Sequence, residues 1–239
     1  MNDFEETVLL VKKYAEQMIA DGVKTVEAGE KILCPDPDKK GVANREKTFI
    51  ELSGRVNQCK KCPLGLTRKN SVFGEGNINA KLMFIGEGPG YNEDCMGKPF
   101  VGRAGQLLDK IIKAMGFARE DVYITNIVKC HPMKDPGHPD MRGNDRKPTF
   151  EEIAVCRSYV DTQIDVIKPK IICALGGVAA GALLNLEAPI GKLRGKFYDL
   201  NGIKLMPTYH PAALLRNESL KAPVWEDMKM IIKELQQAV

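Results

Sequence analysis

A carboxylate lies within a glycine-rich turn, Gly86–Gly90 (GEGPG). Three glycines and one proline in five residues let the backbone approach a ligand closely, and Glu87 would point into the same crevice. The turn has neither the G-x-G-x-x-G spacing of a dinucleotide site nor the Gly-Lys-Ser/Thr of a P-loop. A ligand site built around a carboxylate is one interpretation, and an ordinary strand-to-helix loop is the other.

Two further polar motifs occur later in the chain, Thr125–Cys130 (TNIVKC) and Pro207–Arg216 (PTYHPAALLR). The second contains His210, one of only three histidines. A single histidine is more often structural than catalytic. Because His210 accompanies two other polar motifs, we treat it as a candidate hydrogen-bonding or acid–base group.

These motifs follow segments that we expect to be strands. Apolar runs predict strands over 81–85, 122–125 and 170–175, and Asn201-Gly202 predicts a hairpin over 197–206. Helical spacing, with a capping box at Thr149–Glu152, predicts helices over 104–115, 149–167, 177–184 and 223–237.

The alternation of strands and helices predicts an α/β fold, with a central, mostly parallel, four-stranded sheet flanked by helices on both faces. Ligands bind such sheets at the carboxyl ends of the strands. We therefore expect a site formed by residues 86–103, 125–131 and 207–216.

The first 50 residues form a separate part in this interpretation. Helical spacing over 3–20, a loop at 34–38 and a helix over 43–56 indicate an N-terminal helical extension, 1–50, before a main domain, 51–239. The extension carries no recognisable chemistry.

Composition restricts the class of protein. Of the 239 residues, 44% are hydrophobic and 28% are charged, as in soluble globular proteins. The most apolar stretch, 171–184, is too short to span a membrane, and the acidic N-terminus is unlike a signal peptide. We therefore expect a cytoplasmic protein. The net charge of +4 is concentrated after residue 55, which favours a polyanionic partner.

Four motifs in a fixed order resemble those of the iron–sulfur uracil-DNA glycosylases, family 4 of the uracil-DNA glycosylase superfamily. They are GEGPGYNED, KPFVGRAGQLLD, TNIVKC and MPTYHPAALLRN, and the resemblance covers about residues 55–238. It implies an enzyme that flips uracil out of DNA, hydrolyses its N-glycosidic bond and leaves an abasic site. Uracil-containing DNA would be the partner of a monomeric enzyme.

The resemblance assigns roles to individual residues. Glu87 would stabilise the sugar cation and its water, and His210 would hydrogen-bond uracil O2. Substrate-binding residues would be Gly88, Phe100, which stacks on the base, and Asn126, which reads its edge. Glu93 would support the water, or else be a solvated loop carboxylate.

The residues after His210 would enter the DNA. In this interpretation Leu214 or Leu215 is an apolar wedge that holds the duplex open, and Arg216 contacts a phosphate. Alternatively, the leucines begin a helix that faces the core.

Seven cysteines are many for a reducing compartment, where disulfides rarely persist. The resemblance implies that four of them hold a structural 4Fe–4S cluster: Cys59, Cys62, Cys130 and Cys156. Four thiolates also suit zinc, which the residues alone leave open. Cys173 is expected in the core, and Cys34 and Cys95 receive no role.

The segment 131–148 is longer than is typical of the family. A related branch carries an insertion here whose histidine bonds covalently to the deoxyribose, and His138 would be its counterpart. The basic run of that branch is absent, so we expect a DNA-contacting loop with Arg142, Arg146 and Lys147. A uracil-DNA-binding or covalently trapping protein of the same fold is the alternative function, and an electron carrier is a third. A protein partner of the N-terminal extension stays open.

Overall fold

The computed structural model describes residues 39–237. The chain divides into two compact units, residues 1–43 and 44–239, and all side-chain contacts discussed below lie in the second. The helix expected over 3–20 and the loop expected at 34–38 lie outside the described residues. No helix within 39–237 is both long and apolar enough to cross a membrane.

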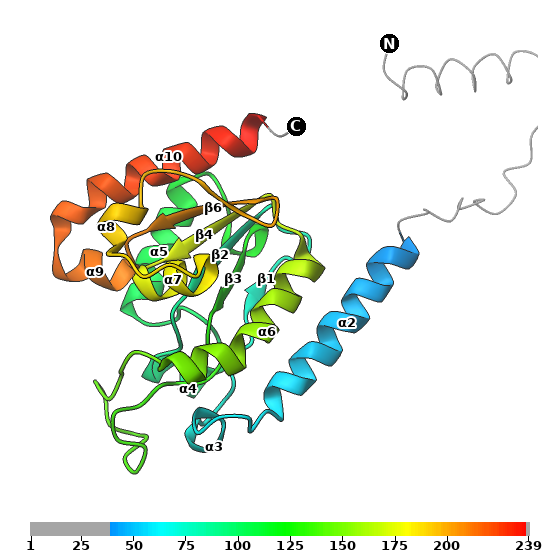
Figure 1. The fold of residues 1–239 in the computed structure, drawn as a ribbon, viewed down its shortest axis with the longest axis vertical. Coiled ribbons are helices and arrows are strands. Elements are labelled where there is room, and N and C mark those ends of the chain that lie inside the picture. Colours follow the sequence, from blue (N-terminus) through cyan, green and yellow to red (C-terminus); the bar gives the residue numbers. More distant parts are fainter. Residues whose placement is uncertain (1–38, 238–239) are drawn as a thin grey trace, which may run out of the picture. The chain divides into compact units, whose positions relative to one another are not determined.

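A single mixed sheet forms the centre of the second unit (Figure 1). Its strand order is β1-β3-β2-β4-β6-β5, in which β3, β2, β4 and β6 are parallel and the two edge strands are antiparallel. The bounds are β1 Glu75–Gly76, β2 Leu82–Gly86, β3 Tyr123–Asn126, β4 Ile171–Leu175, β5 Tyr198–Leu200 and β6 Ile203–Thr208. The predicted α/β class is confirmed, with six strands in place of four. One additional strand is β1, whose two residues are too few to give a clear apolar run. The other is β5, the first strand of the predicted hairpin.

Helices lie on both faces of the sheet, as expected. Their bounds are α2 Lys39–Asn57, α3 Leu64–Thr67, α4 Tyr91–Met96, α5 Arg103–Ala114, α6 Phe150–Ile167, α7 Gly177–Leu184, α8 Ile190–Leu193, α9 Pro211–Arg216 and α10 Lys221–Gln237. The long predicted helices are present within a few residues of their expected ends. The short helices α3, α4 and α8 were not predicted, because four to six residues leave too little periodicity to detect.

Local signals in the sequence act as expected. Thr149 caps α6, since its Oγ1 accepts from the backbone N of Glu152, whose carboxylate accepts from the Thr149 N–H in return. Asn201 and Gly202 have φ of 52° and 85° between β5 and β6. These left-handed conformations are those of a type I′ hairpin turn.

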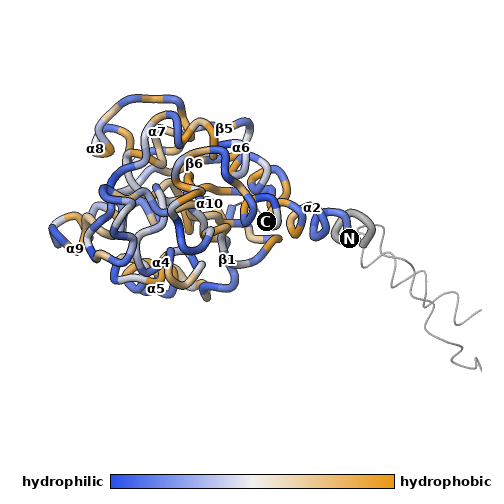
Figure 2. The backbone as a smooth tube through the Cα atoms, turned by 90° about the horizontal axis from the view of Figure 1, so that it is seen from below, coloured by the Kyte–Doolittle hydropathy of each residue, from blue (hydrophilic) through white to orange (hydrophobic). Residues whose placement is uncertain are grey.

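The alternation of side chains along the strands divides the core into two layers. Along β2, Met83 and Ile85 pack with α2, α6 and α7, whereas Leu82 and Phe84 pack with α5 and α10. In Figure 2 the tube of α2 changes between hydrophobic and hydrophilic colours along its length, as expected for a helix with one face on the sheet. The central strands are thereby packed against helices on both faces of the sheet.

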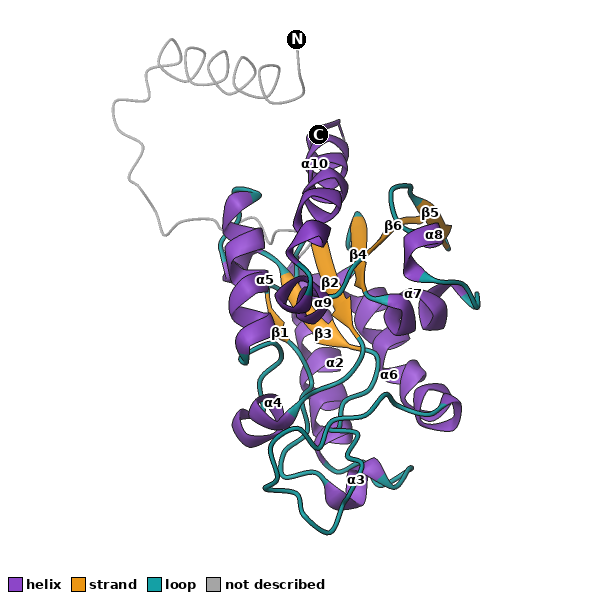
Figure 3. Ribbon diagram, turned by 90° about the vertical axis from the view of Figure 1, so that its left-hand side faces the viewer, coloured by secondary structure: helices purple, strands orange, loops and turns teal. Residues whose placement is uncertain are grey.

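Long loops gather at one end of the sheet, beside α3 and α4 (Figure 3). The end of β6 is held by a buried carboxylate of α10. Thr208 Oγ1 donates to Asp227 Oδ2 at 2.6 Å, and Arg194 donates to both oxygens of Asp227 at 2.7 and 3.0 Å. Because Asp227 is fully buried in α10, these bonds fix the position of β6 two residues before His210.

We therefore predict that Asp227→Ala destabilises the protein strongly, because it leaves the Arg194 guanidinium without its carboxylate. The expected loss is about 3 kcal/mol, which corresponds to a fall in Tm of about 6–12 °C. The matched control is Glu226→Ala in the same helix, because the ion pair between Glu226 and Lys229 is exposed and contributes about 1 kcal/mol at most. Equal melting temperatures for the two variants would contradict this account.

Candidate active site

The loops that follow β2, β3 and β6 enclose a cavity of about 590 Å³. It therefore lies where the carboxyl ends of parallel strands meet, as the sequence predicts. The cavity brings together most of the predicted site residues: Glu87, Gly88, Glu93, Phe100, Asn126, His210 and Arg216. Leu214 and Leu215 are not among its lining residues.

Asn126 is the last residue of β3, and its side chain reaches the cavity. It is only 2% exposed, and its Oδ1 has no hydrogen-bond partner. Gly86, its neighbour on β2, leaves room here, since a Cβ at that position would lie 2.4 Å from Asn126 Oδ1. A buried acceptor without a partner costs about 1–3 kcal/mol, so this oxygen is suited to an N–H donor on a ligand.

Phe100 forms an aromatic wall beside Asn126. Its ring lies over that of His210, with 5.6 Å between the ring centroids and an angle of 29°. The backbone of Phe100 has φ of 51°, a strained conformation for a residue with a side chain. Gly105 permits it, because a Cβ there would lie 1.8 Å from the Phe100 carbonyl oxygen.

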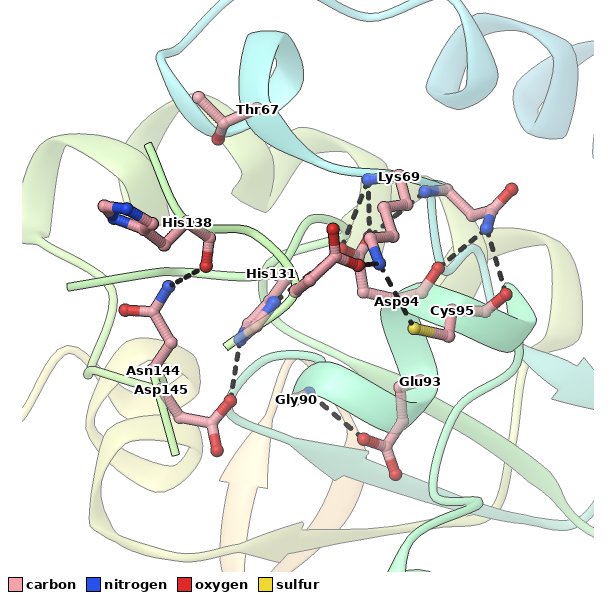
Figure 4. Close-up of polar contacts among 12 residues, drawn as sticks. Thr67, Lys69, Gly90, Glu93, Asp94, Cys95, His131, His138, Asn144 and Asp145 are labelled. Atoms are coloured by element: carbon pink, nitrogen blue, oxygen red, sulfur yellow. Dashed lines mark hydrogen bonds and ion pairs between the residues drawn. The ribbon is translucent and has the colours of Figure 1, made fainter. Parts of the chain in front are cut away.

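Glu93 holds this strained segment in place. Its Oε1 accepts from the backbone N of Val101 at 2.9 Å and of Gly102 at 2.8 Å, and its Oε2 accepts from Gly90 at 3.2 Å. The bond to Gly90, visible in Figure 4, also closes the N-terminus of α4. These bonds give Glu93 a positioning role, so it is not a freely solvated loop carboxylate. Glu93 also lines the cavity, and its support of the water stays a prediction.

Glu87 and its neighbour Gly88 form the part of the cavity nearest β2. Burial raises the pKa of Glu87 above its ordinary value, and the positive charge of Lys147 opposes that shift. A Cβ at Gly88 would lie 2.7 Å from Val128 Cγ2, so the glycine lets the turn pack closely on the loop after β3.

His210 follows β6 and caps α9. Its Nδ1 accepts from the backbone N of Ala212 at 3.1 Å. Burial, together with the charge of Arg216, lowers the pKa of His210 to about 4. The ring is therefore neutral near pH 7, and because Nδ1 accepts, its proton is on Nε2. His210 thus offers the site a neutral hydrogen-bond donor.

The two leucines expected as a wedge have different environments. Leu214 is 2% exposed and packs in the layer formed with α5 and α10, so its assignment as a DNA wedge is wrong. As a helical residue after His210, it faces the core. Leu215 is 42% exposed, and Arg216 lines the cavity.

The segment 131–148 covers one side of the cavity and is anchored by His131. The buried His131 ring bonds Asp145 Oδ1 through Nε2 at 2.7 Å, and its Nδ1 lies 3.7 Å from Asp94 Oδ2 (Figure 4). Burial opposes the charge of His131, but Asp145 and Asp94 raise its pKa to about 9. The exposed His138 pairs with Asp135 instead and is not among the lining residues.

The basic residues of this segment also divide into two kinds. Arg146 donates to both oxygens of Glu152 at 2.8 and 2.7 Å and to the carbonyl of Met133, so it attaches the segment to α6. All three residues expected to contact DNA, Arg142, Arg146 and Lys147, line the cavity. Of these, Arg146 is also engaged in structural bonds.

Comparison with known proteins decides the family. The sequence profile described as the uracil DNA glycosylase superfamily matches residues 73–229. The chain belongs to the uracil DNA glycosylase superfamily. It is 45% identical to a type-4 uracil-DNA glycosylase of Thermotoga maritima over 189 residues, covering 77% of this chain and 93% of that protein. A type-4 enzyme of Saccharolobus solfataricus is 45% identical, covering 77% and 85%. A type-5 enzyme of Pyrobaculum aerophilum is 30% identical, covering 70% and 83%.

In this member of the superfamily the four predicted ligand cysteines pack around one hydrophobic layer: Cys59, Cys62, Cys130 and Cys156. Among residues 39–237, no three His, Cys, Asp or Glu side chains are arranged as metal ligands. Nitrogen donors nevertheless point at two of the sulfurs. Arg68 donates to Cys130 Sγ at 2.8 Å, and the backbone N of Lys129 donates to Cys156 Sγ at 3.3 Å.

Such donors suit thiolates more than neutral thiols. Burial raises the pKa of the Cys130 thiol to about 12, and Arg68 opposes that shift by stabilising the thiolate. N–H bonds to sulfur are a recurring feature of iron–sulfur ligation. The four cysteines therefore suit a cluster by the chemistry of their surroundings, although their side chains are not arranged as metal ligands.

Sequence reasoning gave no individual role to three residues that shape the site: Gly86, Gly105 and Lys129. The two glycines matter only through close contacts, Gly86 with Asn126 on a neighbouring strand and Gly105 with the backbone of Phe100. Lys129 is fully buried, and burial lowers its pKa to about 7. Its position in the otherwise apolar run Ile127–Cys130 was the one available signal.

Glu93 provides a test of the positioning role. We predict that Glu93→Ala lowers the free energy of unfolding by about 2–3 kcal/mol, because three backbone N–H groups lose a charged acceptor. The exposed neighbour Asn92 supplies the control, since Asn92→Ala should change it by about 0.5 kcal/mol or less. Urea denaturation followed by circular dichroism measures both. If Glu93→Ala and Asn92→Ala unfold at the same urea concentration, Glu93 does not hold the loop.

Proposed function

We propose that the protein is a uracil-DNA glycosylase of base excision repair, which hydrolyses the N-glycosidic bond of deoxyuridine and leaves an abasic site. The observation that carries this proposal is the buried, unpartnered Asn126 Oδ1 in a cavity walled by Phe100. Family membership and the type-4 names of the relatives support it. DNA that contains uracil is the substrate.

Asn126 distinguishes uracil from cytosine. Its Oδ1 accepts from uracil N3–H, and its Nδ2 donates to O4. Cytosine presents an acceptor at N3 and a donor at N4, so it would leave both groups of the amide unpaired. The flipped base stacks on the Phe100 ring, which adds contact area without regard to sequence.

Glu87 and His210 act on the two sides of the bond that breaks. The Glu87 carboxylate stabilises the cationic sugar and orients water toward C1′. Water adds to C1′ while the electron pair of the C1′–N1 bond leaves with uracil. The Nε2–H of neutral His210 bonds O2 as charge develops on the base. The water proton passes to Glu87 and then to solvent, from which the uracil anion regains a proton.

DNA would be held by the cations around the cavity mouth. Arg142, Lys147 and Arg216 line the cavity and are the phosphate contacts in this proposal. Leu215 is the exposed apolar residue that would enter the duplex in place of the extruded base. The more basic part of the chain, after residue 55, agrees with a polyanionic substrate.

A 4Fe–4S cluster would be held by the four thiolates of Cys59, Cys62, Cys130 and Cys156. Hydrolysis of an N-glycosidic bond needs no electron transfer, so the proposed role is structural. When bound, the cluster supplies cross-links between the chain before the sheet, the loop after Asn126, and α6. Its loss would loosen that loop.

The pH dependence of excision tests the proposed role of Glu87. We predict that the single-turnover rate falls as acid protonates Glu87, and that this acid-side fall lies at a higher pH than an ordinary glutamate would give because burial raises the pKa of Glu87. His210 stays neutral down to about pH 4, so its protonation does not cause this acid limb of the pH–rate profile. Lys147→Met removes a charge that favours the carboxylate. It should therefore raise the pKa of Glu87 and move the limb to higher pH.

The assay uses a uracil-containing oligonucleotide at saturating enzyme, with alkali cleavage of the product followed on a gel. Glu87→Gln should lose about 2.7–4 kcal/mol of transition-state stabilisation, on the order of 100- to 1000-fold in rate, together with the acid limb. Lys110→Met, at an exposed position on α5, is the charge-matched control and should leave the limb in place. No release of uracil by the wild type would refute the function. An acid limb that persists in Glu87→Gln would remove Glu87 from the mechanism.

A further inference from the structure

Lys129 is a buried cation between the base-reading residue and the cysteines. Its side chain is only 1% exposed. The Nζ donates to Thr125 Oγ1 at 2.6 Å, to the carbonyl oxygen of Asn126 at 2.8 Å and to Gln163 Oε1 at 2.6 Å. These bonds use all three ammonium protons, but all three acceptors are uncharged. A buried charge needs an opposite charge nearby as well as hydrogen bonds.

As ligands of the proposed cluster, the cysteines would supply that charge. The backbone N of Lys129 donates to Cys156 Sγ, and Cys130 is the next residue in the chain. A cluster held by four thiolates is negative overall, so Lys129 has its counter-ion when the cluster is bound. Arg68, which donates to Cys130 Sγ, is the second cation at the same site.

Lys129 also contacts Asn126, the residue proposed to recognise the uracil edge. The carbonyl that Lys129 holds belongs to Asn126, whose side chain lies in the cavity. Gln163 lies on α6, the helix that also carries Cys156, and it further bonds the Phe73 carbonyl and the Tyr123 hydroxyl. Lys129 therefore ties the end of β3 to the helix that carries a ligand cysteine.

We propose that Lys129 is a positioning residue that couples the cluster to uracil recognition, by holding the Asn126 backbone while the cluster thiolates balance its charge. The inference rests on the proposed function and its cluster. Coupling is reciprocal, so if the cluster favours the reading position of Asn126, uracil in the cavity must favour retention of the cluster. The two sites then stabilise each other through Lys129.

The test measures retention of iron rather than turnover. Holoprotein is mixed with the chelator bathophenanthroline disulfonate, and loss of the cluster's visible absorption is timed in the presence of oligonucleotide. One oligonucleotide contains 2′-fluoro-2′-deoxyuridine, whose fluorine disfavours the sugar cation and slows cleavage. The other has thymidine at the same position, so it covers the same protein surface without the cognate base. The ratio of the two release rates isolates the effect of the base.

For the wild type we expect the uracil analogue to slow iron release at least fivefold relative to thymidine, the low end of typical couplings. Lys129→Met should bring that ratio to about one and lower the preference for the uracil analogue in equilibrium binding. Lys134→Met, at an exposed lysine in the next segment, should keep both values. If Lys129 had only a structural role, Lys129→Met would speed iron release equally with both oligonucleotides and leave the ratio of the two rates unchanged.

Three outcomes would overturn the inference: a wild-type ratio of one, an unchanged ratio in Lys129→Met, or an equal loss in Lys134→Met. If Lys129→Met does not fold, Thr125→Val decides. It removes one acceptor of the ammonium, so we expect a smaller ratio than in the wild type, and an unchanged ratio rejects the coupling. Excision by the wild type is assayed in parallel. Uracil release without protection of the cluster defeats only this inference, whereas no release defeats the proposed function.

Discussion

The site depends on one unsatisfied polar atom, the buried Oδ1 of Asn126. A buried acceptor without a partner is costly, and the surrounding chain keeps it open rather than filling it. Gly86 leaves the space that any side chain would occupy, and Phe100 closes it on one side. The unpaired oxygen thus lowers the stability of the free protein slightly, and a base whose N–H donates to this oxygen would remove that cost.

The remaining structure maintains this arrangement from several directions. Glu93 holds the backbone after the strained Phe100, and Asp227 fixes the end of β6 just before His210. The Nζ of Lys129 donates a hydrogen bond to the backbone carbonyl of Asn126. All of these are buried or charge-assisted bonds. Those of Thr208 to Asp227 and of Lys129 to Gln163 join different elements of the fold, so the site is not held by the loops alone.

The sequence predicted what local physics decides. The Thr149 capping box and the Asn201-Gly202 turn place α6 and the last hairpin, and the buried β2 appears as a plain apolar run. Contacts between distant residues were beyond such reasoning, as the bond of Lys129 to Gln163 and the close approach of Gly86 to Asn126 illustrate. Leu214 was misassigned as a wedge because spacing alone does not say which side of a six-residue helix meets the core.

The discrimination between uracil and cytosine by Asn126→Asp tests the central claim most directly. Single-turnover excision is compared on one oligonucleotide that carries either base at the same position. A carboxylate cannot donate to uracil O4 but can accept from cytosine N4. The rate on uracil should therefore fall, and the uracil-to-cytosine ratio should drop by about 10-fold or more, in line with about 1–3 kcal/mol for a bidentate base contact. An unchanged ratio would show that Asn126 does not read the base.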